Sequence, residues 1–248
     1  MTKLKWLGQA GFEVVADAGD TLLIDPYLSD WCKEFSQNPR VPPIPIPPDA
    51  VRAEVVVASH WHEDHLDPGT IRGIAKASPG TVFVGPPSCA LRCHHWGIDP
   101  RRISSLERGQ SLEVGPFTIT AGFARHEVPG MLTEDAISIA IDVDGHRIFH
   151  SGDTEYDARV KATRASVNID VGLFVINGTG GNMNVREAAF LAAEMEVGLA
   201  IPMHYGMWRP EKYGEGATLD PSEFVTCFEA ATGRRGLILQ HAESVDIT

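Results

Sequence analysis

Three histidines and two carboxylates stand within the segment His60-Trp61-His62-Glu63-Asp64-His65. His60 and His62 are two positions apart, so the backbone can direct both imidazoles to one point, while Asp64 and His65 project toward a second. Neutral imidazole nitrogens and anionic carboxylate oxygens are the usual ligands of zinc, manganese and iron. So many ionisable groups beside a buried strand are costly to place unless something organises them. The segment therefore predicts two adjacent divalent metal ions rather than a set of ordinary packed or solvated histidines.

Four ligands do not complete two metal sites, so other parts of the chain should supply more. Three side chains of suitable type each follow a predicted strand: His126 after residues 117–123, Asp153 after residues 146–150, and His204 after residues 199–203. In open α/β sheets the carboxyl ends of strands are where sites form. We therefore expect these three side chains to converge on the first cluster.

Apolar runs and alternating patterns predict the elements that position these residues. Strands are expected over residues 3–7, 12–16, 21–24, 54–59, 81–84, 117–123, 136–143, 146–150, 171–176, 199–203 and 237–240. Helices are expected over residues 70–77, 87–96, 184–197 and 222–231. Asn184 followed by Glu187 is typical of a capping box, and Asp144-Gly145 of a hairpin turn. Six prolines between residues 39 and 48 predict an extended loop.

Strands mixed with helices throughout indicate an α/β layered protein, and we expect one domain over residues 1–248. The formal charge of −12 argues against a nucleic-acid-binding surface, which needs clustered Lys and Arg. No apolar run is long enough for a signal peptide or a membrane span, so we expect a cytoplasmic protein. The four cysteines form no Cys-x-x-Cys pair and are expected to be free thiols.

The order His-x-His-x-Asp-His, a lone His, Gly-Asp and a final His resembles the metallo-β-lactamase superfamily. The resemblance spans nearly the whole chain, from Trp6-Leu7-Gly8-Gln9-Ala10-Gly11-Phe12 to Pro202-Met203-His204. Within the superfamily the chain looks most like the L-ascorbate-6-phosphate lactonase-like branch, on segments such as Val84-Gly85-Pro86-Pro87 and His150-Ser151-Gly152-Asp153-Thr154. The resemblance implies a four-layer αβ/βα sandwich with the site along one edge.

The resemblance also implies how the ligands are shared between two divalent metal ions, zinc or manganese, with iron as a further candidate. It assigns the first metal to His60, His62 and His126, the second to Asp64, His65 and His204, and the bridge to Asp153. Such a pair activates a water to hydroxide near neutral pH and polarises the bond that is attacked. Asp64 is the expected catalytic residue, which orients the nucleophile while it binds metal.

The remaining histidines and one aspartate have weaker claims on the site. We expect His94 and His95 either at the surface or behind the ligands, His146 solvated in a hairpin turn, and His241 outside the site. His150 and Asp25 are candidates to support the ligands from behind. The alternative for Asp25 is a turn-forming residue before Pro26.

Substrate contacts should come from loops at the same edge. The aromatic candidates are Tyr27, Trp31, Tyr205, Trp208 and Tyr213, and the candidate anchors for an anionic group are Arg40 and Arg209. The alternative is that these aromatics only pack the loops and that the arginines are solvated.

The predicted function is a hydrolase that acts on a lactone, ester or amide of a small polar molecule, with no nucleic-acid or membrane partner. The first alternative is a phosphodiesterase or nuclease on the same two-metal site. A member that binds without catalysis is disfavoured by the presence of all seven expected ligands. A redox di-iron protein is disfavoured because no flavin-binding partner domain is attached. No pattern in the sequence indicates an oligomeric state.

Overall fold

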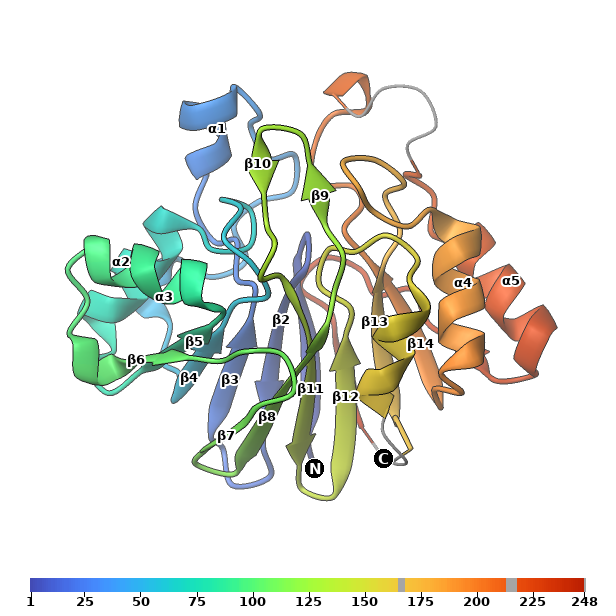
Figure 1. Cartoon of the computed structure of the whole chain (residues 1–248), viewed down its shortest axis with the longest axis horizontal. Coiled ribbons are helices and arrows are strands. Elements are labelled where there is room, and N and C mark those ends of the chain that lie inside the picture. The colour runs from blue at the N-terminus through green and yellow to red at the C-terminus, as the bar shows by residue number, and fades with distance from the viewer. Residues whose placement is uncertain (165–167, 213–217, 248) are drawn as a thin grey trace.

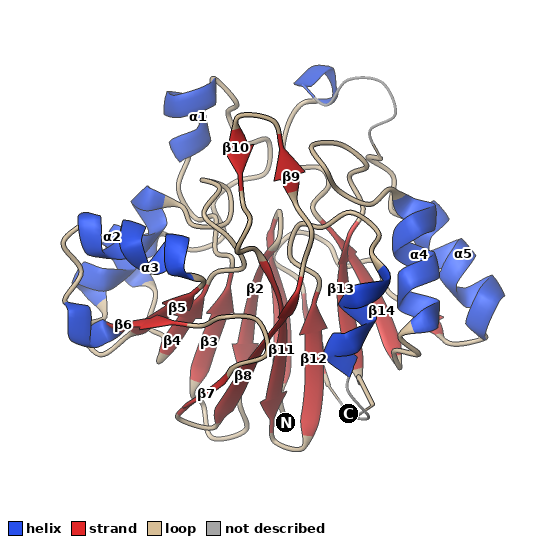
Figure 2. Ribbon diagram, in the orientation of Figure 1, coloured by secondary structure: helices blue, strands red, loops and turns tan. Residues whose placement is uncertain are grey.

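The computed structural model describes residues 1–164, 168–212 and 218–247, in which two mixed β-sheets pack face to face. Helices cover the outer face of each sheet (Figures 1 and 2). The result is the predicted four-layer arrangement of helix, sheet, sheet and helix. None of the described helices is long and apolar enough to span a membrane.

The first sheet has the strand order β16-β1-β2-β3-β4-β5-β6. Its strands are β1 (Lys3–Gly8), β2 (Gly11–Val15), β3 (Thr21–Ile24), β4 (Val55–Val57), β5 (Val82–Gly85), β6 (Ile103–Ser105) and β16 (Ser244–Asp246). Strands β1 to β3 form an antiparallel meander, and β3 to β6 run parallel. Because β2 is antiparallel to both β1 and β3, strands β1, β3 and β4 end at the same edge.

The second sheet has the order β15-β14-β13-β12-β11-β8-β7. Its strands are β7 (Ser111–Val114), β8 (Phe117–Phe123), β11 (Ile137–Val143), β12 (His146–His150), β13 (Val171–Val175), β14 (Leu199–Met203) and β15 (Arg235–Gly236). Strand β11 is antiparallel to both β8 and β12, and β12 to β15 run parallel. Strands β8, β12 and β14 therefore also end at one edge. A separate hairpin of β9 (Glu127–Val128) and β10 (Met131–Leu132) stands above it (Figure 1).

The helices are α1 (Trp31–Ser36), α2 (Pro68–Ala77), α3 (Pro87–His95), α4 (Val185–Glu194) and α5 (Ser222–Thr232), with short 3-10 turns at Pro48–Ala50, Pro100–Arg102, Ala158–Arg164 and Pro210–Lys212. Helices α2 and α3 cover the first sheet, and α4 and α5 cover the second (Figure 2). Asp67 caps α2, and Asn184 with Glu187 forms the predicted capping box on α4.

Two apolar clusters hold the layers together. The larger one joins the inner faces of both sheets, with Phe12 and Phe117 fully buried, and continues to Phe224 of α5. The smaller one lies between the first sheet and its helices, where Ile71 packs with Cys89. Burial of such side chains stabilises the folded state by on the order of 25 cal/mol per Å² of apolar surface. Because the packed layers hold the two sheets together, they also set the distance between the two sheet edges. All four cysteines are free, as predicted.

The structure corrects the prediction at the C-terminal end of the chain. Residues 237–240 form no strand; the edge strand there is β15, and Leu237 adds one backbone hydrogen bond to Ala200. The chain then turns through Ala242, at a φ of 65°, and crosses to the first sheet as β16. The sequence of β16 gave no signal, because this three-residue edge strand is mostly exposed. Helix α1 was also missed, since its six residues carry no side-chain cap.

Candidate metal centre

The predicted ligands come from both sheets and meet where the sheet edges face each other. His60 follows β4, His126 follows β8, Asp153 follows β12 and His204 follows β14. Backbone hydrogen bonds join the two edges at this point: His204 N–H donates to the carbonyl of Gln9 (3.0 Å) and Ile137 N–H to that of Ser59 (3.0 Å). The convergence predicted from strand ends is therefore present.

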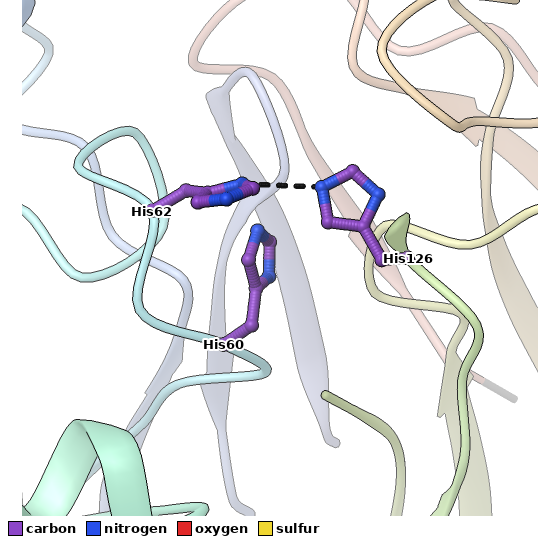
Figure 3. Close-up of side chains that lie close together, drawn as sticks. All are labelled: His60, His62 and His126. Atoms are coloured by element: carbon purple, nitrogen blue, oxygen red, sulfur yellow. Dashed lines mark hydrogen bonds between the residues drawn. The ribbon is translucent and has the colours of Figure 1, made fainter. Parts of the chain in front are cut away.

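Three imidazoles form one half of the cluster, His60, His62 and His126 (Figure 3). His62 Nδ1 and His126 Nε2 lie 3.1 Å apart, and the ring centroid of His60 is 4.5 Å from that of His62 and 4.9 Å from that of His126. Their ring nitrogens lie close enough for a single cation to contact all three. All three residues are buried.

The other half combines imidazoles with carboxylates. His204 Nε2 lies 3.4 Å from Asp64 Oδ2 and 3.3 Å from Asp153 Oδ2, and His65 Nε2 lies 3.3 Å from Asp153 Oδ1. Asp153 also approaches the first half, with Oδ2 3.7 Å from His126 Nε2. Asp153 thus stands between the two halves, where a bridging ligand is expected.

Four of the five imidazoles are held from behind through the ring nitrogen that faces away from the cluster. His62 Nε2–H donates to the Met131 carbonyl (3.1 Å) and His126 Nδ1–H to the Gly181 carbonyl (3.3 Å). His65 Nδ1 pairs with Asp25 Oδ2 (2.7 Å), and His60 Nδ1 with the Ser59 hydroxyl (3.0 Å). Such contacts orient an imidazole and leave its other nitrogen with a lone pair for a metal.

His60 Nε2 is buried with no hydrogen-bond partner among the described residues, and the buried Asp153 Oδ1 has only the ionic contact with His65 Nε2 at 3.3 Å. An unpaired buried polar atom is costly, and nearly all such atoms in folded proteins are satisfied. A divalent cation between the two halves would give His60 Nε2 a partner and would also contact Asp153 Oδ1. The donor set of five nitrogens and two carboxylates therefore fits two metal ions.

The two halves differ in their electrostatics. Burial is the largest influence on His60, His62 and His126 and lowers the pKa of each, so these imidazoles are neutral and ready to bind a cation. In the other half burial opposes charge, but the carboxylates of Asp153 and Asp64 outweigh it and raise the pKa of His204 to about 9. The imidazoles in turn hold the pKa of Asp153 well below its usual value despite burial. Protons on this half neutralise the carboxylates as a cation would.

Comparison with known proteins places the chain in a family. The profile of the Beta-lactamase superfamily domain matches residues 20–205. The chain belongs to the beta-lactamase superfamily. A UPF0173 metal-dependent hydrolase from Pelotomaculum thermopropionicum is 28% identical and covers 99% of this chain and 100% of its own. Another, from Methanopyrus kandleri, is 31% identical over 90% of this chain and 89% of its own.

The same fold is found in a solved metallo hydrolase, Igni18 from Ignicoccus hospitalis, with a TM-score of 0.74 at 22% identity, covering 98% of this chain and 97% of that one. Family and fold are thus those of the beta-lactamase superfamily, and the side-chain cluster could hold metal ions. The comparisons confirm the predicted superfamily and fold, whereas the lactonase-like branch stays a prediction.

Three residues beside the cluster hold its carboxylates and histidines in place. The sequence suggested such a role for one of them and for neither of the other two. Asp25, a candidate from the sequence, is fully buried, accepts the backbone N–H and hydroxyl of Ser59 (2.7 and 2.6 Å), and holds His65. Gln9 Nε2 donates to Asp64 Oδ2 (2.7 Å), and Asn182 Nδ2 donates to Asp153 Oδ2 (2.8 Å). Sequence reasoning missed the last two because neutral amides carry no ligand signal.

Of the other candidate histidines, one supports the cluster and the others lie outside it. The ring of His150 accepts the N–H of Gly152 (3.0 Å) and donates to the Ala10 carbonyl (2.8 Å), so it supports the turn that carries Asp153. His94 and His95 are exposed at the end of α3, as expected. His241 packs edge-on against Trp6, away from the cluster.

A cavity of about 270 Å³ opens onto the cluster and includes His62, Asp64, His126, Asp153 and His204 in its wall. Of the predicted substrate contacts within the described residues, Trp208 lines it, and the Trp208 ring packs against buried Tyr27 with centroids 5.4 Å apart. Trp31 stacks under Arg72, and Tyr205 packs on Trp6 and lines a separate hollow.

The two predicted anion anchors lie elsewhere. The Arg40 guanidinium donates to the carbonyls of Tyr27, Ser29, Pro42 and Pro43, and so fastens the proline-rich loop. Arg209 is exposed and is not among the residues that line the cavity in the described part of the chain. Tyr213 lies outside the described residues.

Proposed function

We propose that the chain is a hydrolase that uses two divalent metal ions, zinc or manganese, to open a lactone, ester or amide bond of a small polar molecule. One observation carries the proposal. Five imidazoles and two carboxylates converge from both sheets, and four imidazoles are fixed through their outer nitrogens. That arrangement orients lone pairs inward, as a metal centre requires.

His60, His62 and His126 would hold one metal, Asp64, His65 and His204 the other, and Asp153 would contact both. When bound, the metals lower the pKa of a water and polarise the carbonyl to be attacked. No serine or cysteine nucleophile is needed.

The protein's own contribution is orientation. Asp64 keeps 21% of its side chain exposed to the cavity, whereas Asp153 keeps 5%. Gln9 fixes one oxygen of Asp64 by donating to Oδ2. The exposed part of the Asp64 carboxylate can therefore accept a hydrogen bond from the attacking water and align it with the carbonyl, as general-base geometry requires.

The test compares reaction classes on one preparation. Purified protein should contain between one and two transition-metal ions per chain by elemental analysis. It should hydrolyse members of a lactone and ester panel faster than bis-p-nitrophenyl phosphate. Turnover of the phosphodiester alone would overturn the proposal and support a phosphodiesterase on the same centre.

A matched pair of variants ties the activity to the cluster. His62→Ala should abolish hydrolysis and lower the metal content, with an unchanged circular dichroism spectrum. His94→Ala, which removes an exposed histidine of α3, should leave both unchanged. Full activity in His62→Ala, or activity in metal-free protein, would contradict the proposed centre.

A further inference from the structure

Beyond the metal cluster, amides form part of the cavity wall. Asn38, Asn177 and Asn182 all line it, and the amide oxygen of each is buried with no hydrogen-bond partner among the described residues. An amide carries two donors and an oxygen with two lone pairs. Because the last torsion of asparagine is broad, rotation about it lets the amide oxygen or the amide nitrogen reach a ligand in the cavity.

Unpaired amides in a binding cavity favour a particular kind of guest. Each unmet hydrogen bond leaves a desolvated polar group whose cost a suitable ligand removes. A ligand's hydroxyl or N–H group can hydrogen-bond to such an amide, whereas a hydrocarbon ligand leaves the amide unpaired. Ser36 and Thr179 add hydroxyl-bearing residues to the same wall.

The charges of the wall argue against an anionic guest. No Lys or Arg lines the cavity in the part of the chain that the structure describes, while Glu63, Asp64 and Asp153 do. The guanidinium of Arg40 is occupied by backbone carbonyls. Phosphate groups are normally held by Arg, Lys or helix N-termini, and a phosphate placed away from the metals would here find carboxylate and amide.

We infer that the cavity selects an uncharged substrate rich in hydroxyl or amide N–H groups, which Asn38 and Asn177 recognise, and that it rejects phosphorylated analogues. The inference rests on the proposed hydrolase function, whose substrate class it narrows. The volume of about 270 Å³ lies just below the usual range of ligand pockets, roughly 300–1,000 Å³, and suits a molecule of monosaccharide size. Trp208 adds an aromatic side chain to the wall, and the apolar side of such a ring can pack against it.

Three lactones of one ring size test the inference: D-ribono-1,4-lactone, its 5-phosphate and γ-butyrolactone. The metal-loaded enzyme should show a kcat/KM for the neutral hydroxylated lactone at least about tenfold above that for each of the others, because a site built for hydrogen bonds discriminates against analogues that lack them. A preference for the 5-phosphate or for γ-butyrolactone would overturn the inference while leaving the hydrolase proposal standing.

Variants assign the discrimination to the amides. Asn177→Ala and, separately, Asn38→Ala should raise KM for ribonolactone and lower its kcat/KM about tenfold more than that of γ-butyrolactone. The matched control Asn168→Ala, at an exposed asparagine, should not change that ratio. A folding defect would lower kcat/KM equally for ribonolactone and for γ-butyrolactone. If each cavity variant loses kcat/KM equally for the two lactones, the amides do not recognise the hydroxyl groups.

A binding measurement keeps the two proposals apart. Calorimetry of the metal-loaded protein with a dihydroxylated pyrrolidinone and with unsubstituted 2-pyrrolidinone needs no turnover. The hydroxylated lactam should bind at least about tenfold more tightly, and Asn177→Ala should remove most of the difference. If no member of the lactone and ester panel is hydrolysed but this preference holds, the hydrolase proposal fails and the recognition stands. Equal affinities for the two lactams would refute the recognition.

Discussion

Asp25 Oδ2 lies 2.7 Å from His65 Nδ1, and both side chains are fully buried. The same carboxylate accepts the backbone N–H and the hydroxyl of Ser59 (2.7 and 2.6 Å), the residue before His60. Asp25 itself sits at a φ of 42°, a conformation that costs energy for a non-glycine residue. One buried carboxylate thus orients ligands in both halves of the cluster without belonging to it.

Replacing Asp25 should therefore weaken metal binding without removing a ligand. We expect Asp25→Asn to lower metal affinity about 10–100-fold, the usual effect of losing a partner behind a metal-binding histidine. Competition with a chromophoric chelator measures it, and Asp49→Asn, at an exposed position, is the control. Wild-type affinity in Asp25→Asn would show that His65 needs no such partner.

Gln9 should affect turnover more than metal content. Its Nε2 donates to the Asp64 carboxylate, and hydrogen bonds to charged groups contribute about 1.5–3 kcal/mol. We expect Gln9→Ala to lower kcat about 10–100-fold while both metals remain bound. Gln110→Ala, at an exposed glutamine, should behave as wild type. Loss of metal together with activity would instead make Gln9 part of the metal-holding framework.

The stability of the metal-free protein should fall as pH rises. His204 has a pKa of about 9 in the folded chain, above the unfolded value of about 6.5, so the folded state holds the extra proton between these values. The stabilisation is fully present below pH ~6.5 and is lost as pH rises through about 9. The pKa difference of His204 sets an upper limit on the order of 3 kcal/mol for this stabilisation. The actual value is smaller, because the neighbouring carboxylates titrate together with His204.

Urea unfolding in the presence of a chelator, at several pH values from 6.5 to 9.5, measures this loss. His204→Asn should flatten the trend. The metal-loaded protein should show the opposite trend, since metal ligands must be deprotonated to bind. A metal-free protein that gains stability over this range would contradict the assigned protonation of His204.

Replacing Gly152 by alanine should destabilise the fold through a steric clash, and Gly130 provides a control that lacks the clash. Gly152 has a φ of 60°, and a Cβ there would lie 2.7 Å from the Ile137 carbonyl oxygen. Gly130 also has a positive φ, of 83°, but its Cβ would meet open space. Both alanine variants pay roughly 1–2 kcal/mol for the left-handed backbone. Gly152→Ala should lose about 1–3 kcal/mol more in denaturant unfolding, because the backbone must shift. Equal losses would mean that this turn can relax.

Local patterns in the sequence predict the ligand types and most of the framework. His60, His62, Asp64 and His65 stand so close together that local geometry alone brings them to one place. His126, Asp153 and His204 were found because each follows an apolar strand, and strands that run the same way end at one edge. Buried strands and the capped helix α4 were readable for the same reason: their patterns are local.

The residues behind and around those ligands are set by tertiary packing, which local patterns do not predict. Gln9 and Asn182 are neutral residues whose partners lie 55 and 29 positions away, so nothing local marks them. Arg40, expected as an anchor for an anion, instead fastens its own loop, and the polar side chains of the cavity wall proved to include amides and carboxylates but no Lys or Arg among the described residues. Such contacts arise where two sheets pack face to face, and the spacing of residues along one chain does not encode which side chains then meet.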